Sequence, residues 1–180
     1  MRKRLNSISI HLFCRIWVVA AVLCTGSVSR SQAGELPLAP VLAQELNMVL
    51  NASVNLHKSL VSQNEEQVDI HLRDIVWQLD RAKSASAYAK DHERGHLLRI
   101  LEAAREHFEM TQTSYGEERR ARLVDAFNQL VNLVRIYRVD RAFSIFFCPK
   151  DRTTWVQRTT KAQNPFRHDR AESCGLRVPR

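Results

Sequence analysis

The feature that most constrains the fold is the long span between Pro40 and Pro149, which contains no proline and in which apolar residues recur every three or four positions. A chain with this period forms amphipathic helices, because one helical turn takes 3.6 residues. Each apolar stripe must be buried against another element. The four stripes are Leu42, Leu46, Val49, Ser53, Leu56 and Leu60; then Val68, Leu72, Ile75, Leu79, Ala82 and Ser86; then Leu97, Leu101, Ala104, Phe108 and Thr111; then Leu123, Phe127, Leu130, Val134 and Tyr137.

Four stripes of similar length, separated by short polar breaks, predict an all-α fold, an antiparallel four-helix up-down bundle over residues 34–140. The chain has only 5 glycines, which are too scattered to build a phosphate-binding loop. A protein of many strands is also excluded, because it would need turn residues every 8–12 positions. We expect residues 141–180 to form an irregular C-terminal flap that packs on the bundle. The stripes fit a monomer and a dimer equally well, so they leave the oligomeric state open.

The first 33 residues have the three-part layout of a secretory signal peptide. A basic start, Met1–Arg4, precedes an apolar run, Ile16–Leu23, and small residues occupy positions 31 and 33. That run is too short to cross a bilayer, which takes about 20 residues. We therefore predict export of a bacterial protein to the periplasm or beyond, with cleavage after Ala33. The alternatives are a retained membrane anchor and a lipoprotein cut before Cys24.

The positive charge is unevenly distributed along the chain. The formal net charge is +8, and residues 1–33 contribute five basic residues and no acid. Residues 34–140 carry 13 basic and 16 acidic residues, whereas residues 141–180 carry 9 basic and 3 acidic residues. An exported protein does not normally meet nucleic acid, so we expect no nucleic-acid partner. A basic flap favours an anionic surface or an envelope protein as partner, and the alternative is a solvated face without a partner.

Cysteine usage supports the same compartment. Cys14 and Cys24 lie in the predicted signal peptide, which leaves Cys148 and Cys174 as an even pair in an oxidising environment. We predict a disulfide between them that tethers the flap. The alternative is a pair of free thiols that bind a metal ion.

Residues His92, Glu93 and His96 spell H-E-x-x-H, in which two imidazoles one helical turn apart bind zinc and the glutamate acts as general base. The motif lies in a charged first turn, and no Gly-x-x-His follows it. A helical bundle of this size also lacks the sheet and cleft that a zinc peptidase uses for its substrate. We therefore predict no enzyme, and a zinc peptidase stays as an alternative.

Three further histidines, His57, His71 and His107, each lie one position from an apolar stripe. Antiparallel folding would bring them to a similar level of the bundle, where three imidazoles could bind Cu²⁺ or Zn²⁺. The alternative is that each is a boundary residue hydrogen-bonded to water or to a neighbouring side chain. We expect no cofactor, with copper or zinc as the alternative.

The C-terminal segment carries Cys148-Pro149, Trp155, Asn164-Pro165 and Cys174-Gly175. This pattern resembles the end of a bacterial extracytoplasmic helical domain of unknown function, which is often attached to copper and heavy-metal efflux adaptors. The resemblance covers about half of the mature chain and implies a helical scaffold with the same C-terminal architecture. It departs at Lys150, where those domains usually have a methionine, and a cation at this position opposes metal binding.

These residues also have a structural interpretation that needs no metal ion. Trp155 and Phe166 can cover the end of the bundle, Asn164-Pro165 favours a fixed turn, and Gly175 permits a backbone conformation that other residues resist. The sequence therefore predicts an exported, non-enzymatic binding or scaffolding module of the cell envelope. A periplasmic module that handles copper or zinc is the first alternative, and the zinc peptidase is the second.

Overall fold

The computed structural model describes residues 35–167 and 174–180. The predicted signal peptide, residues 1–33, lies outside the described residues. Among the helices that are described, none combines the length and the apolar character that crossing a membrane requires.

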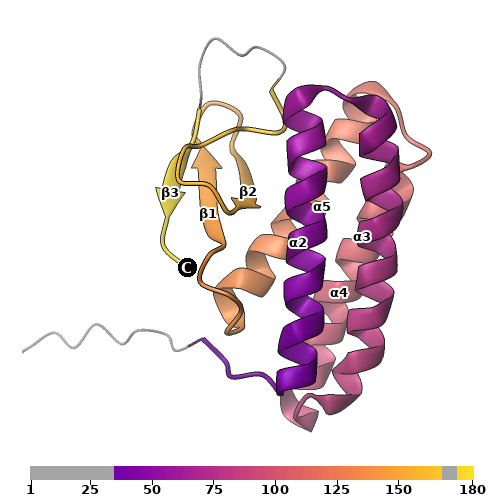
Figure 1. The fold of residues 1–180 in the computed structure, drawn as a ribbon, viewed down its shortest axis with the longest axis vertical. Helices are drawn as coiled ribbons and strands as arrows, with labels where there is room; N and C mark the ends of the chain where they lie inside the picture. Colours follow the sequence, from indigo (N-terminus) through magenta and orange to yellow (C-terminus); the bar gives the residue numbers. More distant parts are fainter. Residues whose placement is uncertain (1–34, 168–173) are drawn as a thin grey trace, which may run out of the picture. The chain divides into compact units, whose positions relative to one another are not determined.

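In the described part of the chain, four long helices follow one another, each antiparallel to the next (Figure 1). They are α2 (Pro40–Ser62), α3 (Glu65–Ala85), α4 (Asp91–Thr111) and α5 (Gly116–Ile136). A short 3-10 helix, η1 (Ser86–Tyr88), follows α3. The start of α3 is capped by Asn64, whose side-chain oxygen accepts a hydrogen bond of 3.1 Å from the backbone N–H of Gln67. The predicted four helices are thus confirmed.

The predicted stripes form the core of this bundle. Every stripe residue is buried except Leu60, which is partly buried and packs against the core. Phe108 of α4 and Phe127 of α5 meet edge to face, with ring centroids 6.0 Å apart. Edge-to-face packing of buried rings adds to the burial of their apolar surface.

The C-terminal flap is not irregular, which corrects the purely helical prediction. It forms a three-stranded antiparallel sheet of β1 (Ser144–Cys148), β2 (Thr153–Gln157) and β3 (Leu176–Val178), in the order β2-β1-β3. A tight turn joins β1 to β2, and Arg152 in this turn has a positive φ of 58°. The strands are rich in β-branched and aromatic residues, which fit a pleated, buried surface. Phe146 lies opposite Trp155, and their rings stack at 5.9 Å.

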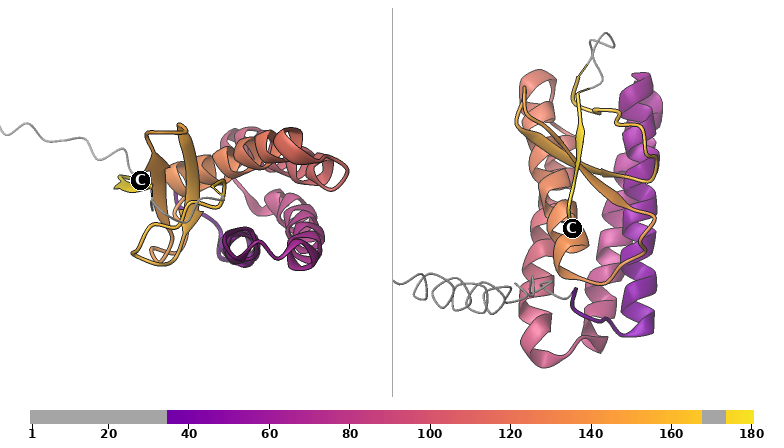
Figure 2. Two further views of the ribbon diagram at one scale, coloured as in Figure 1. Left: turned by 90° about the horizontal axis from the view of Figure 1, so that it is seen from above. Right: turned by 90° about the vertical axis from the view of Figure 1, so that its left-hand side faces the viewer.

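The sheet occupies the side of the bundle between its first and last helices. Helices α2 and α3, α3 and α4, and α4 and α5 pack as neighbours, while β2 packs against both α5 and α2 (Figures 1 and 2). The hydroxyl of Thr154 in β2 donates a hydrogen bond to the side-chain oxygen of Asn128 in α5. The bundle is therefore completed by the flap, and residues 35–180 form one compact unit.

Both ends of this unit are held near the end of α5. Leu36 forms a parallel bridge with Tyr137, and Arg180 forms an ion pair of 3.3 Å with Glu35. Arg180 also donates a hydrogen bond of 2.6 Å to the carbonyl of Asp140. These contacts fix the path of the chain into and out of the flap.

Candidate functional site

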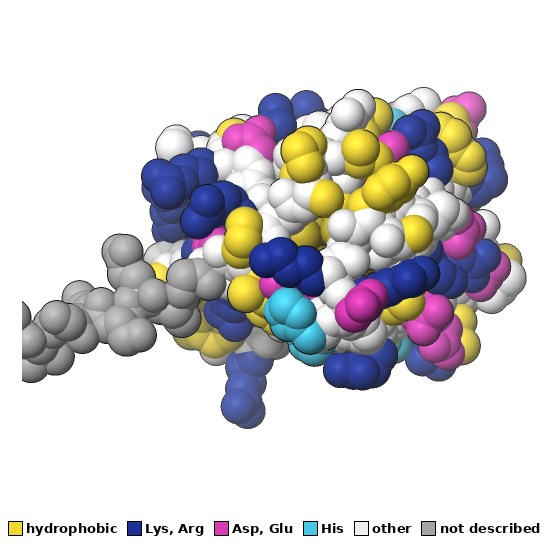
Figure 3. All heavy atoms as spheres, turned by 90° about the horizontal axis from the view of Figure 1, so that it is seen from below, with side chains coloured by type: hydrophobic (Ala, Val, Ile, Leu, Met, Phe, Trp, Pro, Cys, Tyr) yellow, Lys and Arg dark blue, Asp and Glu magenta, His cyan; other side chains and the backbone are white. Residues whose placement is uncertain are grey.

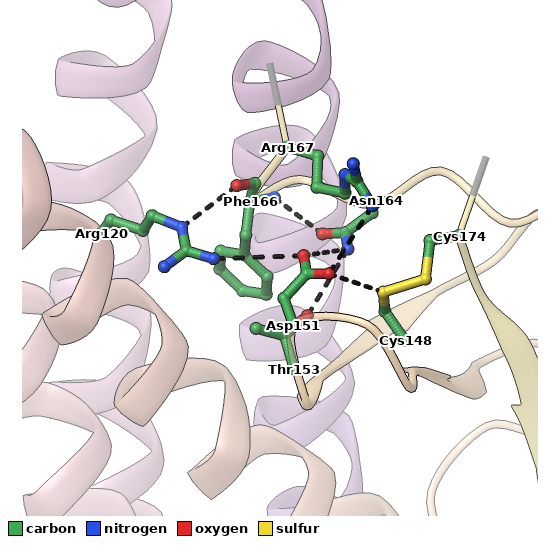
Figure 4. The surroundings of a disulfide bond; sticks show 8 residues. All are labelled: Arg120, Cys148, Asp151, Thr153, Asn164, Phe166, Arg167 and Cys174. Atoms are coloured by element: carbon green, nitrogen blue, oxygen red, sulfur yellow. Dashed lines mark hydrogen bonds and ion pairs between the residues drawn. A yellow bond between two sulfur atoms is a disulfide. The ribbon is translucent and has the colours of Figure 1, made fainter. Parts of the chain in front are cut away.

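The predicted disulfide is present and joins two parts of the flap. Cys148 ends β1, and Cys174 lies two residues before β3. The two Cα atoms are 5.2 Å apart, within the ordinary range for a disulfide. The disulfide therefore links the end of β1 to the segment just before β3 (Figure 4).

The Trp155 and Gly175 positions of the C-terminal motif pack directly on each other. A Cβ atom added to Gly175 would lie 2.6 Å from the Cβ of Ala162 and 2.9 Å from Cη2 of Trp155. The backbone of Gly175 is not in the left-handed region, because Gly116 is the one described glycine with a positive φ. We expected Gly175 to be needed for its backbone freedom, and this was wrong. The structure requires a glycine here because Trp155 lies against its backbone.

Asn164 and Pro165 form the predicted turn. The Oδ1 atom of Asn164 accepts a hydrogen bond of 2.9 Å from the N–H of Phe166, and its Nδ2 donates one of 3.1 Å to Oδ2 of Asp151. The ring of Phe166 then packs edge to face on Phe127 of α5 at 5.5 Å. Pro165 is buried, whereas Pro149 is exposed in the turn between β1 and β2. The turn thus anchors the flap to the helices.

A buried glutamine, Gln157, organises the loop after β2. Its Oε1 accepts a hydrogen bond of 2.8 Å from the indole N–H of Trp155 and another of 3.2 Å from the N–H of Gln163. Its Nε2 donates to the carbonyls of Thr159 and Lys161, at 2.9 and 2.8 Å. Sequence reasoning missed this role, because a single glutamine at the end of a strand has no motif around it.

His57 of α2 holds the same loop from the other side. It is 3% exposed, and its Nε2 lies 2.7 Å from the carbonyl oxygen of Gln163, to which it donates a hydrogen bond. Burial lowers the pKa of His57 from its ordinary value, the hydrogen bond to Gln163 opposes this, and Lys58 lowers it further. His57 is therefore neutral at pH 7 and engaged with the flap.

The three histidines predicted to share one level do not form a metal cluster with one another in the described part of the chain. His57 bonds to the flap, as described above. His71 and His107 are each partly buried, and Nδ1 of His107 is buried without a hydrogen-bond partner. For His57 the structure favours the alternative interpretation, a boundary histidine that bonds to a neighbouring group.

The H-E-x-x-H residues lie at the start of α4 and point in different directions. His92 and His96 are exposed, while Glu93 is buried and its Oε1 lies 3.4 Å from Nε2 of His92. Nδ1 of His96 shares a hydrogen bond of 3.1 Å with the hydroxyl of Tyr137. Burial, with a smaller contribution from Glu93, raises the pKa of Tyr137. Within the described residues, no group of three ligand atoms gathers around this motif.

The one described group of three metal-ligating side chains lies at the disulfide, and it includes a residue that sequence reasoning missed. Ligand atoms of Cys148, Cys174 and Asp151 all lie within 4.8 Å of one another. Oδ1 of Asp151 is 2.8 Å from the sulfur of Cys148 (Figure 4). A disulfide sulfur carries no proton, so this contact is not a hydrogen bond in the oxidised protein. The sequence feature that could have revealed Asp151 is the tight turn after Cys148, because such a turn brings the residue three positions later back beside the first.

Asp151 is surrounded by cationic and amide groups. Nη2 of Arg120 lies 4.0 Å from its Oδ2, and Nη1 of Arg167 lies 3.8 Å from its Oδ1. The Nε of Arg120 also donates a hydrogen bond of 3.2 Å to the carbonyl of Phe166. The side chain of Asp151 is only 15% exposed, so its carboxylate is enclosed by the flap and by α5.

Comparisons with known proteins add no further information on the site, because no family model, curated protein or solved structure matches this chain. The resemblance of the C-terminal motif to an extracytoplasmic helical domain therefore stays a prediction.

Proposed function

We propose that the protein is an exported, non-enzymatic binding module of the cell envelope, which presents its flap to an anionic lipid surface. The observation that carries the proposal is the distribution of charge on the flap. Four exposed cations, Arg141, Arg152, Lys161 and Arg177, form no ion pair with any described residue. The only acidic side chain in the described part of the flap is Asp151, which is enclosed.

The helices differ from the flap in their balance of charge, because acidic residues outnumber basic ones over residues 34–140. Five of the nine helix arginines form ion pairs with acids, as in the contacts of Arg119 with Glu65 at 3.0 Å and of Arg105 with Asp80 at 2.7 Å. On the end of the unit where α2 begins, acidic side chains lie among the cationic ones (Figure 3). An anionic surface attracts a segment whose exposed cations are unpaired and outnumber its acids more strongly than a segment where the two signs alternate.

The attachment of the described part of the flap to the helices supports a role in presentation. Phe166 fixes it to α5, His57 fixes it to α2, and the disulfide closes it. A surface that is ordered before binding loses little conformational entropy on contact. Predicted export also fits a partner in the envelope, and the disulfide is typical of an oxidising compartment.

The test is sedimentation of the exported, oxidised protein with vesicles. We expect binding to vesicles that contain an anionic phospholipid and none to vesicles of phosphatidylcholine alone. Each basic residue near such a surface contributes about 1 kcal/mol, so replacing the four flap cations by glutamine should abolish binding. Binding should also weaken as salt is added, because salt screens exposed charges.

The matched control replaces four exposed bundle cations, Lys58, Arg73, Arg94 and Arg135, by glutamine. This variant has the same net charge as the flap variant and should keep most of the binding. Equal losses in the two variants would show that net charge and not the flap is responsible, and the proposal would then be abandoned.

A further inference from the structure

We propose that reduction of the Cys148–Cys174 disulfide creates a binding site for a divalent cation of the zinc class, with both thiolates and the Asp151 carboxylate as ligands. The inference is independent of membrane binding, since it concerns the enclosed interior of the flap. It starts from the three ligand atoms that lie within 4.8 Å of one another.

The backbone already places the two cysteines as a metal site requires. Their Cα atoms are 5.2 Å apart, so rotation about the Cα–Cβ bonds lets both sulfurs reach one ion at about 2.3 Å. Cys148 is held in a strand, and Gly175, the residue after Cys174, lies against Ala162 and Trp155. The packing that positions the cysteines therefore does not depend on the disulfide alone.

Asp151 supplies the third ligand through a specific oxygen. Its Oδ2 accepts the hydrogen bond from Asn164, while Oδ1 faces the sulfur of Cys148 at 2.8 Å. The hydrogen bond from Asn164 orients the carboxylate, as outer partners of metal ligands commonly do. Two sulfurs and one carboxylate oxygen suit zinc, and water can take the fourth position of a tetrahedron.

The charges around the site also favour the loaded state. Two thiolates, one carboxylate and a divalent cation leave a net charge of −1 in an enclosed region. The guanidinium groups of Arg120 and Arg167, at 4.0 and 3.8 Å from Asp151, offset that charge. The positive charge of Lys150 is therefore compatible with this site, because the three ligands carry more negative charge than the divalent ion carries positive charge.

The chemistry balances with a dithiol as reductant. The dithiol gives two electrons and two protons to the disulfide, the S–S bond between Cys148 and Cys174 breaks, and a new S–S bond forms in the reductant. Metal binding then releases the two thiol protons to solvent, and two metal–sulfur bonds form. Oxidation and metal loading use the same sulfurs, so each excludes the other.

The test uses the exported protein, reduced with dithiothreitol and freed of it without oxygen, and then titrated with Co²⁺ and Zn²⁺. We expect the reduced protein to bind one Co²⁺ per chain with a thiolate-to-cobalt charge-transfer band, which Zn²⁺ removes. The oxidised protein and the double variant Cys148→Ser, Cys174→Ser should show no band. Absence of the band from the reduced protein, whether its helical circular dichroism persists or is lost, overturns the proposal.

Two variants test the third ligand. Asp151→Asn keeps a hydrogen-bond acceptor for Asn164 but removes the charge, and we expect its affinity for Co²⁺ to fall at least tenfold. Asp125→Asn makes the same change on the exposed face of α5 and should bind as the parent does. Equal affinities of Asp151→Asn and the parent would refute the assignment of Asp151. Neither variant alters the four exposed flap cations, so a failure here is distinguishable from a failure of vesicle binding.

Discussion

Replacing Gly175 by alanine adds one methyl group where the backbone of the flap lies against Ala162 and Trp155. The new Cβ would lie 2.6 Å from the Cβ of Ala162, and 2.9 and 3.0 Å from Cη2 and Cζ2 of Trp155. Carbon atoms in contact are normally about 3.5–4.0 Å apart, so the methyl group falls short of this distance by roughly 1 Å. Trp155 is fully buried and stacks on Phe146, and it therefore has little room to move.

Such overpacking costs about 1–3 kcal/mol, and three simultaneous clashes place Gly175→Ala at the upper end of that range. For a unit of this size the loss corresponds to a fall in Tm of about 5–10 °C. The measurement is urea unfolding of the oxidised protein, with a thiol count to show that the disulfide has formed in both proteins.

Gly95→Ala is the matched control. Gly95 lies in α4, and an added Cβ meets no atom within 4 Å. Alanine favours a helix over glycine by about 1 kcal/mol, so this variant should be more stable than the parent. The explanation of Gly175 fails if Gly175→Ala unfolds within about 0.5 kcal/mol of the parent, because surface substitutions already vary by that much.

Three further predictions concern the attachments of the flap. Replacing Cys148 and Cys174 by alanine should lower the free energy of unfolding by about 3 kcal/mol, measured with urea, because the disulfide closes a loop of sequence separation 26; an unchanged midpoint would contradict this. The lowered pKa of His57 means that the unfolded chain binds more protons below about pH 6.5, so stability should fall as the pH drops below that value and level off below the folded pKa. His57→Gln should show a shallower fall between about pH 7 and 5, and parallel profiles would refute the role given to His57. Gln157→Leu removes the partner of the indole N–H of Trp155 and of three loop groups, and should cost about 1–3 kcal/mol by thermal unfolding, whereas a loss below 0.5 kcal/mol would contradict the role of the glutamine.

The bundle could be predicted from the sequence because its signal is local and repeated. A stripe such as Leu72, Ile75 and Leu79 has the period of a helix, and all three residues are fully buried in the structure. The disulfide could be predicted because only two cysteines follow the predicted signal peptide. The first prediction rests on the period of single helices and the second on the number of cysteines. Neither requires knowledge of which elements pack together.

The sheet was missed because its strands do not alternate. In β1 and β2 nearly every residue is buried, since one face turns to the helices through Thr154 and the other, with Trp155, is covered by the loop after β2. A strand buried on both faces has a continuous apolar run, which cannot be told from a helix end by period. Asp151 was missed for a related reason. The role of Asp151 depends on the turn after Cys148 and on two arginines. Arg120 lies distant in the sequence, and Arg167 lies outside any motif.

The flap has two kinds of residue, and they serve different purposes. Residues that turn inward, such as Thr154 and Phe166, contact α5 and cover the side of the bundle between α2 and α5, while Trp155 and Gln157 hold the loop after β2 over the other face of the sheet. Three of the four unpaired cations, Arg141, Arg152 and Lys161, lie outside the strands and are exposed. Their charges can therefore be removed without opening the core, and a loss of membrane binding in that variant would report on the surface and not on the fold. Cys148 is buried with the first group, and its sulfur closes the flap when oxidised and is a proposed metal ligand when reduced.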